Sequence, residues 1–132
     1  EEDGVDDENE VQSMQITPAQ NEFWLACKNG DEEAIYRLVR TEGADVNMPD
    51  TDFGGWTACH YAACSGRSRV MESLWRLGGD MQACNAAGAT PLHLAAAEGH
   101  VALVAKMVSR GADVNCTNKF GITPLHQAAF NG

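Results

Sequence analysis

The stretch GATPLHLAAAEGH at residues 88–100 decides the fold, because the chain repeats it twice with variations. GWTACHYAACSGR stands at residues 55–67 and GITPLHQAAFNG at residues 121–132. The Thr, His and Ala residues that the copies share recur every 33 positions, and this regularity indicates one structural unit used repeatedly. The histidines show the register most plainly: they are His60, His93 and His126.

Each copy carries the signals of a short helix followed by a second one. Thr90 precedes Pro91, and Thr is a favoured helix cap while Pro suits the first helical position. Gly99 then permits a left-handed turn into a second helix, which buries its apolar stripe against neighbouring units. That second helix is predicted from apolar residues at helical spacing: Val101, Leu103, Val104, Met107 and Val108.

A second recurring segment, GADVN, stands at residues 43–47 and 111–115. Its Gly suits the left-handed conformation after a helix, and its Asp and Asn close turns with their side chains. We therefore expect a turn after each second helix. The first unit departs from the T-P-L-H pattern, and its helix is expected to begin at Thr17, with Gln20 completing a capping box.

A period of 33 residues that carries T-P-L-H-x-A-A resembles the ankyrin repeat, and the resemblance covers residues 17–132. It implies an all-α fold, an ankyrin-repeat solenoid of stacked helix-turn-helix units with β-hairpin fingertips. The last unit stops after one helix, so we expect the face of Leu125 and Ala129 to lack its cover. The predicted units are residues 17–51, 52–84, 85–117 and the partial unit 118–132.

Residues 1–15 have a different composition from the repeat domain predicted at residues 16–132. They hold seven of the 19 acidic residues and few large apolar ones, so we predict a disordered acidic arm. The remaining 12 acids still outnumber the nine Lys and Arg residues, and a negative surface repels a nucleic-acid backbone. We expect no nucleic acid partner. No apolar run approaches the roughly 18 residues of a membrane span, so no membrane insertion is expected.

The chain has five cysteines, an odd number, and they form no C-x-x-C pair. This pattern favours free thiols in a reducing compartment over a disulfide framework, which predicts a cytoplasmic or nuclear protein. We also expect the protein to be a monomer.

The three histidines are the sharpest candidates for chemistry. Packed helices lie about 8–10 Å apart, whereas zinc ligands lie about 2 Å from one ion, so the histidines of two units cannot share a metal. The resemblance implies instead that each His hydrogen-bonds the Thr and backbone of its own or a neighbouring turn. His60 and Cys64 form a weaker metal pair, because Cys59 points about 100° away around the helix. We expect no metal, no cofactor and no enzyme activity.

The resemblance also implies a concave face, built from fingertips and first helices, on which another protein or a peptide binds. Aromatic residues at these positions are expected to act as apolar anchors, and charged ones to orient the partner. Carried over position by position, the predicted partner-binding residues are Phe53, Trp56, Cys64, Ala89, Glu98, Lys119, Phe120, Ile122 and Phe130.

Three alternatives to this interpretation stay open. Trp56 or Ile122 could lie across the adjacent fingertip and have a purely structural role. The array could be the regulatory or targeting segment of a larger enzyme, channel or signalling protein. Trp56 could also stack on a nucleotide or another planar ligand, although the acidic body disfavours anionic nucleotides.

Overall fold

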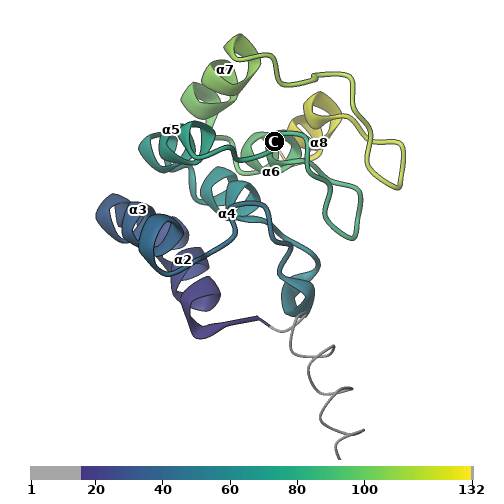
Figure 1. The fold of residues 1–132 in the computed structure, drawn as a ribbon. Helices are drawn as coiled ribbons and strands as arrows, with labels where there is room; N and C mark the ends of the chain where they lie inside the picture. Colours follow the sequence, from purple (N-terminus) through teal and green to yellow (C-terminus); the bar gives the residue numbers. More distant parts are fainter. Residues whose placement is uncertain (1–15, 132) are drawn as a thin grey trace, which may run out of the picture.

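The computed structural model describes residues 16–131, so the predicted arm at residues 1–15 lies outside the described residues. Three helix pairs and a final single helix make up this part of the chain (Figure 1). The pairs are α2 (Pro18–Asn29) with α3 (Glu32–Thr41), α4 (Ala58–Ser65) with α5 (Ser68–Arg76), and α6 (Pro91–Ala97) with α7 (Val101–Ser109). The single helix is α8 (Pro124–Asn131), and a 3₁₀ turn, η1, covers Thr51–Phe53.

The helices stack in chain order, as the 33-residue register predicts. The first helices of the units, α2, α4, α6 and α8, pack against one another in that sequence. Figure 1 shows α3, α5 and α7 along one side of this stack and the loops that join the units projecting from the other side. The all-α solenoid is therefore confirmed. None of the helices within residues 16–131 is long and apolar enough to cross a membrane.

The predicted helix starts are confirmed. Thr90 and Thr57 both cap their helices in reciprocal boxes with the His three residues later, and the glycine after α4, Gly66, has a φ of 70°. Thr17 caps α2 by accepting a hydrogen bond from the Gln20 amide at 3.1 Å. The second half of the capping box predicted there is wrong. The Gln20 side chain is buried and hydrogen-bonds both backbone groups of Asp45 instead, since its amide supplies a donor for the carbonyl at 2.9 Å and an acceptor for the N–H at 2.7 Å.

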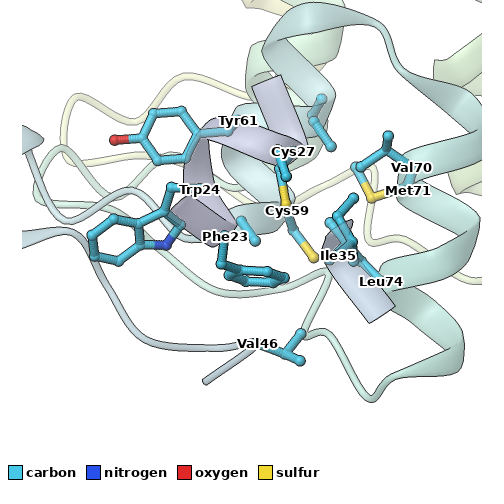
Figure 2. Close-up of a cluster of buried hydrophobic side chains, with 14 of the residues drawn as sticks. Phe23, Trp24, Cys27, Ile35, Val46, Cys59, Tyr61, Val70, Met71 and Leu74 are labelled. Carbon is cyan, nitrogen blue, oxygen red and sulfur yellow. The ribbon is translucent and has the colours of Figure 1, made fainter. Parts of the chain in front are cut away.

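One apolar core runs through the units. Figure 2 shows side chains from both helices of the first two units interleaved in a single cluster, among them Phe23, Ile35 and Leu74. Leu103 and Met107 continue the core into the third unit. Each fully buried side chain of this size stabilises the fold by about 1.5–3 kcal/mol. The core therefore depends on neighbouring units covering one another.

The loops between units, here called the finger loops, cover residues 50–56, 85–89 and 118–122. Asp50 and Trp56 form an antiparallel bridge, and the other two loops close with N–H···O bonds of 3.0 Å. No extended strand forms in the described residues, so the fingertips are turns rather than full β-hairpins. Adjacent loops bond to each other: the Lys119 amide donates to the Ala87 carbonyl at 2.9 Å. Gly88 fits this close approach, since a Cβ there would lie 2.8 Å from that amide nitrogen.

Candidate functional site

His60 links its own unit to the next one. Its Nδ1 accepts a hydrogen bond from the Thr57 amide at 3.0 Å, and its Nε2 therefore carries the proton and donates to the Ala89 carbonyl at 2.8 Å. The ring is completely buried, and this burial lowers the pKa of His60 below its ordinary value, against the raising effect of the bond to Ala89. The neutral imidazole is a structural bridge.

The second histidine of the ladder makes the same bridge. His93 Nδ1 accepts from the Thr90 amide at 3.1 Å, and Nε2 donates to the Ile122 carbonyl at 2.7 Å. His126 keeps its contact to Thr123, at 2.9 Å between Nδ1 and Oγ1. The predicted hydrogen-bonding role of the histidines is confirmed, and the partner carbonyl of each bridge lies in the finger loop of the following unit.

Cys27 and Cys59, the two cysteines buried in the core, are poor nucleophiles. Burial raises the pKa of the Cys59 thiol to about 12, and it raises that of Cys27 further, with help from the nearby Cys59. Figure 2 shows both sulfur atoms inside the apolar core. Within residues 16–131 no group of three His, Cys, Asp or Glu side chains is placed to hold a metal ion.

The finger loops and the adjacent ends of α2, α4 and α6 form a surface that we call the finger-loop face. Phe53 and Phe120 project from the first and third loops with 68% and 76% of their surface exposed. Lys119 is also exposed on it, whereas Glu98, which is exposed too, lies at the C-terminal end of α6 and lines the hollow between α6, α7 and α8. The face therefore combines two apolar side chains on separate loops with the positive charge of Lys119.

An aromatic and cationic cluster stands at the Phe53 end of this face. The Lys28 ammonium lies 4.6 Å from the centre of the Tyr61 ring and 5.9 Å from that of Phe53. The Tyr61 hydroxyl donates to a buried Asp50 oxygen at 2.7 Å. Burial and this carboxylate both raise the pKa of Tyr61, so the phenol stays neutral. Trp56 completes the cluster, with its ring centre 5.3 Å from that of Tyr61.

Comparison with known families agrees with this geometry. A family model described as ankyrin repeats, in three copies, matches residues 23–118. The chain belongs to the ankyrin repeat family. Ankyrin repeats are generally protein–protein interaction modules and typically have no enzymatic role.

The ankyrin fold exposes the predicted site residues to solvent to different degrees. Ala89 is a correction: only 7% of it is exposed, because it stands at the base of its finger loop, where its carbonyl accepts the hydrogen bond from the buried His60, so it offers a partner almost no side-chain surface. Cys64 and Ile122 are half-buried. Phe130 belongs to α8, but its side chain lies outside what the structure describes.

Trp56 has mainly a packing role in the array. Its ring is half-buried, and it tilts against both Tyr61 and His60 of its own unit. This is close to the structural alternative considered for it, except that the contact is to α4 rather than to an adjacent fingertip. A planar ligand would find only part of the indole face open.

Sequence reasoning missed two features of this ankyrin array. The Lys28–Tyr61 contact joins the first helices of two units, and no local sequence pattern predicts it. The second is an apolar groove of about 650 Å³ at the C-terminal end, between α6, α7 and α8. The exposed face of Leu125 was expected, but the valines that widen the groove were assigned to the core: Val101, Val104 and Val108.

Proposed function

We propose that this ankyrin array binds a partner protein or peptide on its finger-loop face. The exposure of Phe53 and Phe120 carries the proposal. Each Phe can contribute about 150 Å² or more of contact area, and exposed apolar groups of this size usually mark recognition surfaces. Both belong to loops that bond to neighbouring loops, so the rings stand on an ordered base and lose little entropy on binding.

The charges on this face indicate the chemistry of the partner. Lys28 lies over aromatic rings and, within residues 16–131, no carboxylate pairs with it. It is free to attract an acidic group of a partner. Phe53 stands next to it, and Phe120 stands two loops away beside Lys119. An extended segment with apolar anchors at both ends and an acidic residue near one of them fits this arrangement.

The test is photo-crosslinking from the finger-loop face. The chain carries a benzophenone amino acid at position 119, and adducts formed in a native lysate are identified by mass spectrometry. The variant Phe53→Ala with Phe120→Ala should lose the specific adducts at least about tenfold, since each anchor supplies 1 kcal/mol or more. Helical content should stay unchanged, because both rings are exposed.

The matched control is Leu125→Ala, which removes an equally exposed apolar side chain from a different surface. It should leave the adducts as they are in the unsubstituted chain. Adducts that survive the double substitution, or that disappear equally with Leu125→Ala, would refute the proposed location.

The free cysteines support a reducing compartment for this interaction. All five are free, and Cys27 and Cys59 are buried in the core. We therefore include in the proposal that the protein acts in the cytoplasm or nucleus. Fluorescent tagging of the full natural protein, with a secreted location as the contrary outcome, tests it.

A further inference from the structure

We infer that the acidic arm, residues 1–15, docks on a row of three arginines along the outer helices of the array. The outer helices α3, α5 and α7 lie on the other side of the stack from the finger loops, so this row is separate from the surface proposed above (Figure 1). The C-terminal end of each outer helix supplies one arginine, and all three side chains are exposed. Within residues 16–131 none of the three forms an ion pair with a carboxylate. The arginine row consists of Arg40, Arg76 and Arg110.

Two arginines of the row lie over aromatic rings. The Arg110 guanidinium is 4.3 Å from the centre of the Trp75 ring, and the Arg40 guanidinium is 5.2 Å from the centre of the Tyr36 ring. A guanidinium that stacks on a ring uses its flat face and keeps its N–H edges for an acceptor. Because the ring also restricts the side chain, less entropy is lost when a carboxylate binds. These arginines are therefore well prepared to bind carboxylates.

The first two arginines of the row share one aromatic neighbour. Hydrogen bonds with Ser73 and Arg76, followed by the charges of Arg76 and Arg40, lower the pKa of the Tyr36 phenol below its ordinary value, although burial acts in the opposite direction. Both cations therefore lie near the Tyr36 hydroxyl. One short acidic stretch can bind the two of them.

Positive charge exceeds negative charge along the row. From the middle of each outer helix to the residue after its end, the chain holds five cations and two carboxylates, Glu42 and Glu72, although its formal net charge is −10. A hydrogen bond from Lys106, followed by the charges of Lys106, Arg76 and Arg110, lowers the pKa of Glu72. The negative end of a helix dipole favours such cations but does not cancel their charge. The five cations are Arg37, Arg40, Arg76, Lys106 and Arg110.

The acidic arm joins the array beside the Arg40 end of the row. It contains seven carboxylates and no Lys or Arg, and one residue separates it from Thr17, the cap of α2. The first turns of α2 lie next to the C-terminal half of α3, because Glu22 pairs with Arg37 at 3.2 Å. A chain of 15 residues spans up to about 50 Å, and the row crosses two steps between units of about 8–10 Å each. The arm is therefore long enough to follow the row.

The covalent link favours the chain's own arm over an acidic segment of another protein. Exposed ion pairs are individually weak, but the link gives the arm an effective concentration of about 1 mM at the row. An acidic segment of another protein binds there only if it displaces the arm. The arm therefore screens the row, and an acidic partner meets the exposed lysines of the finger-loop face instead, Lys28 and Lys119.

The first test is NMR spectroscopy of the full 132-residue chain, which detects the Nε–H group of each arginine. In a comparison chain every Asp of the arm is replaced by Asn and every Glu by Gln. The Nε–H signals of the arginine row should differ between the two chains, and adding a peptide of residues 1–15 to the comparison chain should restore the signals of the unsubstituted chain. The Nε–H of Arg67, which donates to the Lys28 carbonyl, is the internal control and should not move. Unchanged signals in the row, or equal changes at Arg67, would overturn the inference.

The second test locates the site with substitutions at exposed positions, so that the fold survives. Fluorescence anisotropy of the labelled arm peptide should show at least about tenfold tighter binding to the comparison chain than to the unsubstituted chain, whose own arm competes. Arg76→Gln with Arg110→Gln, made in the comparison chain, should weaken this binding at least about tenfold. The matched control, Lys28→Gln with Lys119→Gln, removes the same charge from the finger-loop face and should leave it unchanged.

Two results of the second test would contradict the inference. Equal binding to the two chains would mean that the row is open to acidic segments of other proteins. A loss of binding with the lysine pair rather than the arginine pair would place the arm on the finger-loop face.

Discussion

His93 and His126 stand at the same position of neighbouring units, with the same Thr three residues before them. His93 is buried, and its Nε2 proton is donated to the Ile122 carbonyl of the following loop. His126 is exposed, and within residues 16–131 the hydrogen bond of its ring is to Thr123 of its own unit rather than to a following loop. The same Thr–His pattern therefore links two units in the middle of the array but makes only a local hydrogen bond at its end. A repeat residue contributes stability largely through the unit that follows it, as expected for a one-dimensional stack.

The largest difference in stability should come from Leu92 and Leu125, which stand 33 residues apart and hold equivalent positions in their units. Leu92→Ala creates a cavity in the core, so the free energy of unfolding should fall by about 3 kcal/mol. Leu125→Ala changes an exposed side chain and should alter it by less than about 0.5 kcal/mol. Urea denaturation followed by circular dichroism measures both. A similar loss at the two positions would show that the groove is already covered in solution.

The equivalent histidines should give the next effect. His93→Ala leaves the Ile122 carbonyl and the Thr90 amide without their partner in a buried site, and stability should fall by about 2 kcal/mol. His126→Ala should change it by less than about 0.5 kcal/mol, since the ring is exposed. The same denaturation curves decide the matter. If both substitutions were equally destabilising, the prediction would be wrong, and His126 would have to make a bond to a following segment as His93 does.

Two glycines sharpen the comparison because both have left-handed backbones, with φ of 70° at Gly66 and 75° at Gly99. Replacement by Ala strains both positions, at about 1 kcal/mol each. Only at Gly66 does the new methyl also displace the His100 ring from its bond to Cys64. Gly66→Ala should therefore destabilise the fold by about 1 kcal/mol more than Gly99→Ala. Thermal unfolding of the two variants side by side tests this, and identical melting temperatures would contradict it.

The smallest effect should be the pH dependence contributed by His60. Burial holds its pKa in the folded state below the ordinary value of 6.5, so the unfolded chain binds more protons just below that pH. The stabilising contribution is therefore complete above about pH 6.5 and is lost as the pH falls toward the folded-state pKa. Between pH 7.5 and 5.5 the unsubstituted chain should lose up to about 1 kcal/mol more stability than His60→Gln. Parallel pH slopes for the two proteins would contradict this prediction.

Local signals predicted most of the fold. Thr and Pro positions gave the helix starts, and Gly residues gave the helix ends, because capping and left-handed turns involve residues only a few positions apart. The candidate site was harder to predict. Phe53 and Phe120 are exposed as expected, but Ala89 is buried under a bond that arrives from His60, 29 residues earlier. Whether a fingertip residue faces solvent depends on the neighbouring loop, which no local pattern specifies.

The sequence by itself determined the repeating unit, its 33-residue register and the helices within it, since these follow from short-range backbone and side-chain preferences. Only the tertiary structure decided which carbonyl each histidine binds, where Lys28 meets Tyr61, and that the valines of α7 open into a groove. These outcomes arise when units stack. Each such contact joins residues about 30 positions apart, and its geometry is fixed by the packing of two units rather than by either one alone.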